Sequence, residues 1–148
     1  MRILILQHTD QTTAGSTLEW LKNKNARHEV RALHKGDALP SMEDFDWLVL
    51  CGGGMNLDQV DLHPWLAEEK QFVRQAIANG KTVLGLCLGG QMISQCLGGA
   101  VKPHEHWEVG WHPVQIGAED RLTVFQWHQD TFSIPEGATR IASSRSCE

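Results

Sequence analysis

The 148-residue sequence lacks several features that would place a protein in a specialised class. Its longest apolar runs, Trp47–Cys51 and Thr82–Leu88, are far shorter than the roughly 20 residues that span a bilayer. Only four apolar residues separate Arg2 from Gln7, so no signal peptide is predicted. Lys and Arg number 13 against 18 Asp and Glu, and they form no basic block. We therefore expect a cytoplasmic chain that binds neither membranes nor nucleic acid.

Tyrosine is absent and cysteine is scarce. Apart from Trp111, the six tryptophans are predicted to pack in the core and at its rim. The four cysteines, at 51, 87, 96 and 147, form neither a C-x-x-C pair nor the framework of a secreted disulfide protein. Cys51 and Cys96 are predicted to be small buried hydrophobic residues. Cys87 stands in a context that predicts chemistry instead.

What the sequence does contain is an alternation of strand and helix patterns. Apolar or alternating stretches predict strands at 2–6, 28–33, 46–51 and 82–86. Helices are predicted over 12–24, from Pro64 to a stop at Gly80, and from Gly89 to about Gly98. This order predicts an α/β fold in a single domain, residues 1–148, with an open, mostly parallel, doubly wound sheet of flavodoxin or Rossmann type.

The pattern changes after residue 100. Strand patterns at 109–116 and 122–127 flank a turn, which predicts a small antiparallel excursion. A further strand is predicted at 140–144. No helix pattern follows that would cover it, so we expect the sheet to be unfinished.

Cys87 lies between a predicted buried strand and a predicted helix, with Gly85 and Gly89 two residues away on either side. This spacing is typical of a nucleophile elbow, with cysteine in place of serine. Such a turn strains the backbone of the nucleophile, and flanking side chains would collide. The helix N-terminus favours a thiolate, and the Leu88 N–H is directed at a developing oxyanion. The alternative is a buried cysteine in a tight strand–helix joint.

A second glycine segment, Gly52-Gly53-Gly54, also follows a predicted strand. In a parallel sheet it lies at the same edge as Cys87, where open α/β sheets bind their ligands. Its unshielded N–H groups suit a second oxyanion donor, and the alternative is a plain flexible turn. It is not a phosphate loop, because no Gly-Lys-Ser/Thr and no G-x-G-x-x-G pattern is present.

These segments resemble the class I glutamine amidotransferases. Gly85–Gln91 resembles the family's G-x-C-x-G-x-Q signature, and Cys51–Met55 resembles its G-G-P oxyanion loop, with Gly54 in place of the proline. Glu108–Val114 resembles the E-I-G-W-x-P-V segment of the glutamine pocket. Trp127–Ala138 resembles the W-H-G-D-x-F…LP-x-G-A stretch of stand-alone members similar to the glutaminase half of GMP synthetase.

The resemblance implies roles for the matching positions. Cys87 would attack the γ-carboxamide of glutamine, or of another γ-glutamyl compound, and release ammonia through a γ-glutamyl thioester. Gly53 and Leu88 would donate N–H groups to the oxyanion. The residues implied to hold the glutamine are Gln91, Gly110 and Trp111. No cofactor is implied.

One family element has no match in these residues. The late His-x-Glu element, which supplies the catalytic base, is missing, so we expect a C-terminally incomplete and impaired glutaminase. General acid–base help is worth on the order of 10²–10⁴ in rate. His128 and Asp130 have His-x-acid spacing and are candidates for a surrogate base. The alternative is a loop histidine fixed by the residues that follow it.

The sequence allows two other functions and suggests one possible metal site. A pseudo-glutaminase would bind glutamine without turning it over, or would bind a partner. The unfinished sheet edge could then pair with a partner subunit or with a second copy of the chain. A cysteine-type α/β-hydrolase would use Asp120 and then His128, but it leaves Gln91 unexplained. His104 and His106 alternate with Glu108 in a metal-like pattern, yet a solvated polar loop is favoured and no metal is predicted.

Overall fold

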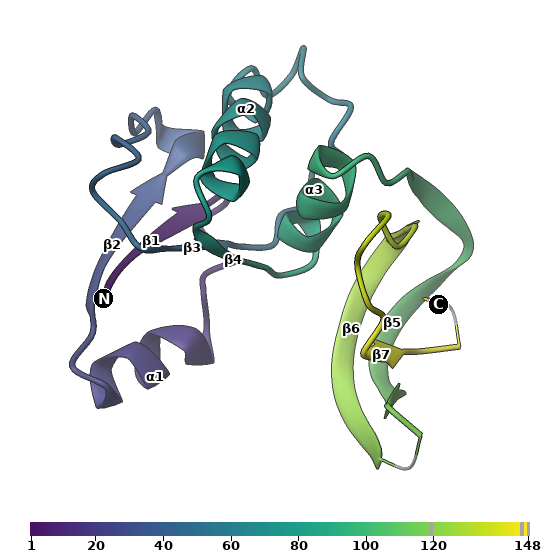
Figure 1. Ribbon diagram of the computed structural model, residues 1–148. Coiled ribbons are helices and arrows are strands. Elements are labelled where there is room, and N and C mark those ends of the chain that lie inside the picture. Colours follow the sequence, from purple (N-terminus) through teal and green to yellow (C-terminus); the bar gives the residue numbers. More distant parts are fainter. Residues whose placement is uncertain (119, 146, 148) are drawn as a thin grey trace. The chain divides into compact units, whose positions relative to one another are not determined.

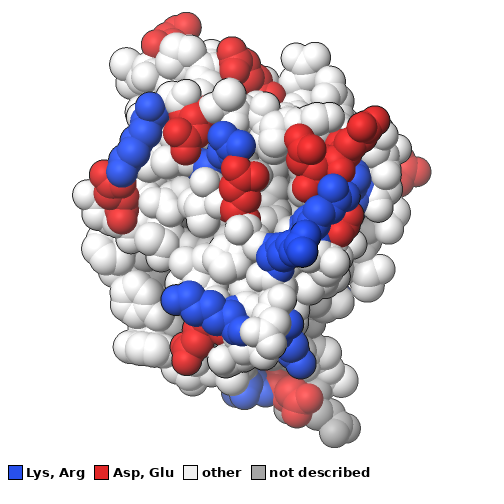
Figure 2. Space-filling view, turned by 90° about the vertical axis from the view of Figure 1, so that its left-hand side faces the viewer, with Lys and Arg blue, Asp and Glu red and all other residues white. Residues whose placement is uncertain are grey.

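The chain divides into two compact units in a computed structural model that describes residues 1–118, 120–145 and 147. The N-terminal unit comprises residues 1–96 and the C-terminal unit residues 97–148. Among the described residues, no helix is long and apolar enough to cross a membrane. On the face shown in Figure 2, basic and acidic side chains are interspersed rather than gathered by sign.

The N-terminal unit is built on a parallel sheet in the order β2-β1-β3-β4 (Figure 1). Its strands are β1 (Arg2–Gln7), β2 (Arg27–Ala32), β3 (Trp47–Leu50) and β4 (Thr82–Gly85). Its helices are α1 (Ser16–Asn23), α2 (Trp65–Ala78) and α3 (Leu88–Cys96), with a 3-10 turn η1 (Leu33–Lys35). The predicted α/β fold with a parallel sheet is confirmed. All four strands therefore end at one edge.

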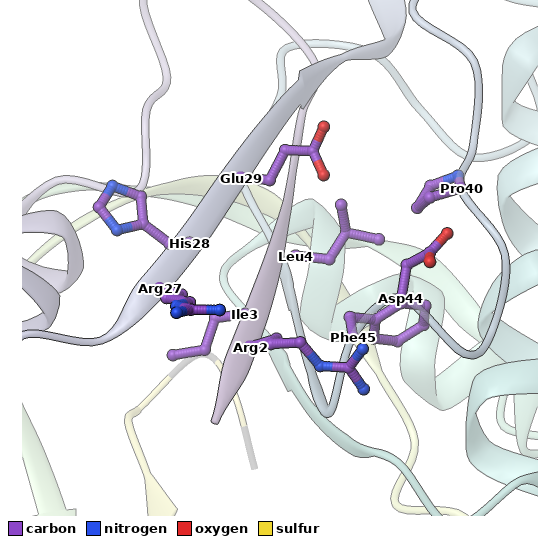
Figure 3. A pocket seen from close by; sticks show the side chains of 9 residues that line it. All are labelled: Arg2, Ile3, Leu4, Arg27, His28, Glu29, Pro40, Asp44 and Phe45. Atoms are coloured by element: carbon purple, nitrogen blue, oxygen red, sulfur yellow. The ribbon is translucent and has the colours of Figure 1, made fainter.

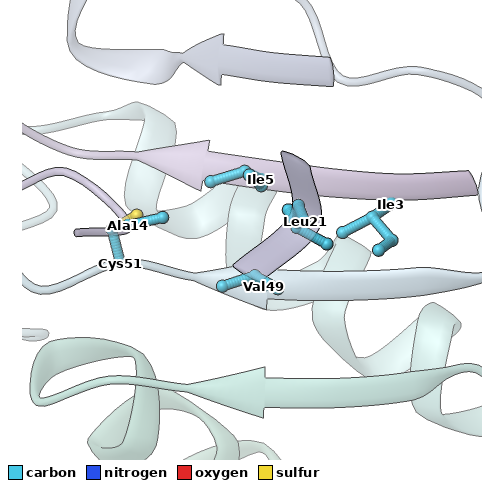
Figure 4. Packing of buried hydrophobic residues seen from close by; sticks show 6 residues of the cluster. All are labelled: Ile3, Ile5, Ala14, Leu21, Val49 and Cys51. Carbon is cyan, nitrogen blue, oxygen red and sulfur yellow. The ribbon is translucent and has the colours of Figure 1, made fainter. Parts of the chain in front are cut away.

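The two central strands, β1 and β3, are buried on both faces, as their continuous apolar runs predict, whereas β2 and β4 have no buried residue, contrary to the buried strand predicted at 82–86. On one face, Ile3, Ile5, Val49 and Cys51 pack with Ala14 and with Leu21 of α1 (Figure 4). Because side chains alternate along a strand, Leu4, Leu6, Leu48 and Leu50 face the other side. There α2 covers the sheet, opposite to α1 (Figure 1).

The helix boundaries follow local backbone chemistry. Gly80 ends α2 as predicted: its φ is 69°, and the N–H of Lys81 reaches back to the Ala76 carbonyl at 3.0 Å. The predicted helix over 12–24 is wrong at its start, because α1 begins only at Ser16. Gly15 precedes it in the left-handed region at φ 51°, and Thr12 contacts the loop after β3 instead.

The C-terminal unit is an antiparallel sheet in the order β6-β5-β7. Its strands are β5 (Val101–Ile116), β6 (Asp120–Phe132) and β7 (Ala142–Ser143). The antiparallel excursion is confirmed, but β5 is longer than predicted. The expected polar loop around His104 and His106 is part of β5, where the pairing shifts between Pro103 and Glu108. The last predicted strand shortens to β7 and joins this sheet by pairing with β5.

Trp107 and Trp127 of the C-terminal unit are exposed, contrary to the core and rim packing predicted for them, and so is Trp111, which that prediction excepted. Trp107 and Trp127 are 60% and 69% exposed, and Trp111 is 73% exposed. Trp111 lies opposite Phe125 across the β5–β6 ladder, with ring centroids 5.8 Å apart, and Phe125 also contacts Trp127. Glu108 is the one buried residue among the described residues of this unit.

A small open pocket of about 160 Å³ lies at the amino ends of β1 and β2 (Figure 3). Its lining mixes charges of both signs, including Arg27, Glu29 and Asp44. The guanidinium of Arg2, which also lines it, is paired with Asp46 at 2.9 Å. This pocket is at the sheet edge opposite to Cys87, so it is separate from the candidate site.

Candidate active site

Cys87 occupies a strained turn between β4 and α3. Its φ is +51°, in the left-handed region that non-glycine residues seldom adopt, and the residue is exposed. The turn is held on both sides: the Leu86 N–H donates to the Leu50 carbonyl at 2.9 Å, and the Gln91 N–H donates to the Cys87 carbonyl at 3.0 Å. Strain of this kind costs about 1–3 kcal/mol and concentrates at functional sites.

The two glycines that flank Cys87 are required by space. A Cβ at Gly85 would overlap the backbone of Gly89, and a Cβ at Gly89 would lie 2.5 Å from the Leu50 carbonyl oxygen. Close approach of strand and helix therefore depends on both glycines. This is the collision that the elbow spacing predicts, and it keeps the Cys87 side chain at the carboxyl edge of the sheet.

The glycine segment after β3 lies against this turn. A Cβ built on Gly52 would be 3.6 Å from the Cβ of Cys87, and one built on Gly53 would be 2.8 Å from Leu88 Cδ2. The two positions suggested as oxyanion donors thus follow neighbouring parallel strands, and Gly53 lies against the side chain of Leu88. A Cβ at Gly53 would displace the side-chain ends of Met55 and Leu88, whereas a Cβ at Gly54 would meet nothing within 4 Å.

Beneath the glycine segment lies a buried pair that the sequence analysis missed. His8 follows β1, and its Nε2 is 2.8 Å from Glu69 Oε1 on α2, with both side chains 0% exposed. Its Nδ1 is 3.1 Å from the Gly52 carbonyl, and Trp65 stacks on the ring at 5.5 Å. The one available signal was position: His8 is among the first polar residues after a strand that neighbours β3, at the ligand-binding edge.

The buried pair alters the titration of its neighbours. Burial by itself lowers the pKa of His8, but the hydrogen bond and charge of Glu69, with the Gly52 and Cys51 carbonyls, outweigh it and raise the pKa above 6.5. Burial, and then the charge of Glu69, raises the pKa of the Cys51 thiol to about 11. Cys51 is therefore an inert core thiol, as predicted, whereas Cys96 is only half-buried.

Gln91, also on α3, is buried with 6% of its surface exposed. The other two suggested glutamine-binding residues belong to the C-terminal unit. Gly110 has φ +116° in the middle of β5, and Trp111, the next residue of the same strand, is exposed. The described side chains contain no group of three or more His, Cys, Asp or Glu placed to hold a metal ion.

The C-terminal unit holds a second histidine–glutamate pair. His128 Nε2 is 3.1 Å from Glu108 Oε2, and the Ser144 hydroxyl donates to the same oxygen at 2.9 Å. His128 Nδ1 is 3.1 Å from the backbone carbonyl of Asp130. The acid that contacts the imidazole is therefore Glu108, which lies directly opposite His128 in the β5–β6 ladder, and Asp130 contributes through its main chain.

The α/β-hydrolase interpretation does not fit this strand arrangement. Asp120 and His128 lie in the same extended strand, β6, and opposite different residues of β5. Eight positions along a strand span roughly 26 Å, too far for an acid–histidine contact.

Comparisons with known proteins show which proteins this chain resembles. Residues 9–148 match the family model "Glutamine amidotransferase class-I". The glutamine amidotransferase-like protein YfeJ of Salmonella typhimurium is 28% identical, over 99% of this chain and 68% of that protein. A crystal structure of a glutamine amidotransferase from Thermotoga maritima is 32% identical, with a TM-score of 0.95, over 100% of this chain and 69% of that one. A glutamine-hydrolysing GMP synthase component from Thermoplasma acidophilum is 28% identical, over 72% of this chain and 56% of its own length.

Proposed function

Because the chain belongs to the class I glutamine amidotransferase family, we propose that it hydrolyses the side-chain amide of glutamine, or of a related γ-glutamyl compound, with Cys87 as nucleophile. The observation that carries this proposal is the left-handed backbone of an exposed Cys87 beside the glycines after β3. The family match extends across both units, which supports treating 1–148 as one amidotransferase-like domain.

The reaction proceeds in two displacements. The Cys87 thiolate adds to the γ-carbon of the amide, and the carbonyl oxygen becomes an oxyanion. Collapse of this intermediate breaks the C–N bond, and the amine leaves as ammonia once it has taken up a proton. The γ-glutamyl thioester that remains is then hydrolysed by water to glutamate and the free thiol.

Two backbone donors are proposed for the oxyanion. Gly53 lies against the Leu88 side chain, Gly52 lies against Cys87, and the Leu88 N–H belongs to the first turn of α3. Fixed donors of this kind act where charge develops, and removal of one costs about 10²–10³ in kcat.

The remaining roles rest on the motif matches. Gln91, Gly110 and Trp111 are proposed to hold the glutamine. His128 is the proposed surrogate base that protonates the leaving amine, and the contact at 3.1 Å makes Glu108 its acid partner in place of the Asp130 carboxylate.

The test is ammonia release from glutamine by the wild-type chain and by Cys87→Ala. We expect release that depends on Cys87, together with a glutamyl adduct on the Cys87 peptide in mass spectra of acid-quenched samples. Cys96→Ala removes the cysteine at the last residue of α3 and should leave both signals in place. His128→Ala should slow ammonia release by roughly 10²–10⁴.

Three results would each overturn part of this proposal. Ammonia release that persists in Cys87→Ala would exclude Cys87 as the nucleophile. If the chain binds glutamine but forms neither an adduct nor ammonia, it is a pseudo-glutaminase that only binds its ligand. If His128→Ala turns over at the wild-type rate, the surrogate base is wrong while the nucleophile stands.

A further inference from the structure

We propose that His8 and Thr12 are positioning residues that fix the orientation of the Gly52–Gly53 peptide, so that the Gly53 N–H serves the oxyanion at Cys87. This inference rests on the proposed function, because it assigns a task to the proposed oxyanion donor. Neither side chain needs to touch the substrate, since both act through the peptide that they hold.

Two donors converge on one carbonyl oxygen. His8 Nδ1 lies 3.1 Å from the Gly52 oxygen, and Thr12 Oγ1 lies 2.9 Å from it. A carbonyl oxygen only accepts, so both groups donate to it. His8 comes from the end of β1 and Thr12 from the segment before α1. The carbonyl is therefore held from two independent parts of the fold.

Fixing this carbonyl also fixes the next N–H. The Gly52 carbonyl and the Gly53 N–H belong to one planar trans peptide, in which they point in opposite directions. With the oxygen turned to His8 and Thr12, the Gly53 N–H is turned away from them. Rotation of this peptide is easy when both flanking residues are glycine, since neither has a Cβ to resist it. External donors are therefore needed to hold one orientation.

The orientation of the His8 ring is set in turn by Glu69. The carboxylate contacts Nε2 at 2.8 Å, and stacking on Trp65 fixes the plane of the ring. A carboxylate and a carbonyl are both acceptors, so this arrangement calls for a proton on each ring nitrogen. Burial of a charge pair is costly and is tolerated when it has a geometric task.

The hydroxyl of Thr12 is oriented in the same way. The Thr12 N–H donates to Thr9 Oγ1 at 3.0 Å, and the two threonine hydroxyl oxygens are 2.7 Å apart. The Thr9 hydroxyl can therefore donate to Thr12 Oγ1, which leaves the Thr12 hydroxyl proton for Gly52. The short polar segment after β1 thus has a definite direction of hydrogen bonding.

Matched substitutions test the proposal without leaving Glu69 charged and alone. In a Glu69→Gln background, His8→Asn places an amide N–H near the position of Nδ1, whereas His8→Gln places one near Nε2. We expect the Asn variant to keep kcat within about threefold of Glu69→Gln, and the Gln variant to lose about tenfold or more, with KM little changed. Thr12→Ser should likewise retain kcat, and Thr12→Val should lower it.

A second readout separates positioning from general damage. Iodoacetamide alkylates a thiolate by displacing iodide and forms no oxyanion, so its rate at Cys87 should be the same in all these variants. Equal kcat in His8→Asn and His8→Gln, or alkylation that falls in parallel with kcat, would overturn the proposal.

A third readout does not depend on turnover. The carbonyl carbon of Gly52 reports its hydrogen bonds through its NMR chemical shift. We expect this resonance to move in His8→Gln and in Thr12→Val and to stay in place in the Asn and Ser variants. An unchanged resonance throughout would overturn the positioning role. Absence of Cys87-dependent ammonia release in the wild type, with the expected NMR shifts, would instead contradict the proposed function alone.

Discussion

The two units of the chain each contain a histidine–glutamate pair with the same connections but in different surroundings. In both, Nε2 contacts a carboxylate and Nδ1 contacts a backbone carbonyl, of Gly52 for His8 and of Asp130 for His128. The pair His8–Glu69 is wholly inaccessible, whereas 14% of the His128 side chain remains exposed. The same pattern of contacts therefore occurs once with no exposed surface and once with part of the imidazole exposed.

This difference in access separates two kinds of task. A group that exchanges protons with a substrate must be reached by it, and His8 is reached by nothing outside the protein. His8 is suited to hold backbone, while His128 is suited to proton transfer. The surrounding architecture follows the same division, since the buried hydrophobic residues lie between Ile3 and Met92 and the C-terminal unit exposes its aromatic rings.

Breaking each pair should give the largest effects. His8→Leu leaves the Glu69 carboxylate buried without its partner, and we expect the free energy of unfolding to fall by about 3–5 kcal/mol. His128→Leu should cost less, about 1.5–3 kcal/mol, because Glu108 keeps its hydrogen bond from Ser144. Urea unfolding at pH 7, followed by tryptophan fluorescence, measures both. Equal losses would remove the distinction between the pairs.

Apolar truncations test the same contrast between the units. Leu48 is 0% exposed in the centre of the parallel sheet, so Leu48→Ala should lower the free energy of unfolding by about 2–5 kcal/mol. Trp127 is 69% exposed, and Trp127→Ala should change it by less than about 0.5 kcal/mol. The m-values should match that of the wild type. A large loss in Trp127→Ala would mean that its ring is covered in solution.

Two glycines of the candidate site should differ in their tolerance of a methyl group. Gly89→Ala brings a Cβ within 2.5 Å of the Leu50 carbonyl oxygen and should cost about 1–3 kcal/mol of stability. Gly54→Ala meets nothing within 4 Å and should stay within about 0.5 kcal/mol of the wild type. Thermal unfolding of the two variants side by side checks this. Similar melting temperatures would contradict the close strand–helix approach.

The smallest expected effect is a pH dependence. The folded-state pKa of His8 is raised above 6.5, so its protonation stabilises the fold fully below pH 6.5 and less as pH rises through the folded-state pKa. Glu69→Gln removes the charge that raises this pKa. The difference in unfolding free energy between wild type and Glu69→Gln should therefore shrink between pH 6.5 and alkaline pH. If the difference in unfolding free energy grows over this range, His8 is not the protonated partner of Glu69.

The parallel sheet and the elbow could be predicted because their signals are local. Strands buried on both faces appear as unbroken apolar runs, as in β1 and β3. The turn at Cys87 needs glycine at fixed spacing, so the sequence itself carries the constraint that Gly85 and Gly89 meet in space.

The parts that could not be predicted depend on long-range contacts. His8 and Glu69 are 61 positions apart, and no pattern along the chain connects them. Glu108 was assigned to a pocket motif, yet it faces His128 only because β5 and β6 pair in that register. Thr12 lies in a stretch whose pattern predicts a helix. Its hydroxyl donates to the Gly52 carbonyl instead, and the residue lies before the start of α1.

The left-handed backbone at Cys87 lowers the stability of the fold at the same position that holds the proposed nucleophile. Holding a side chain there costs about 1–2 kcal/mol, which glycine would not incur. Cys87→Gly should therefore fold at least as stably as the wild type while it loses the sulfur that is proposed to form the thioester. Selection for thermal stability alone would favour glycine at this position, so the persistence of cysteine there would measure how strongly selection acts on the reaction itself.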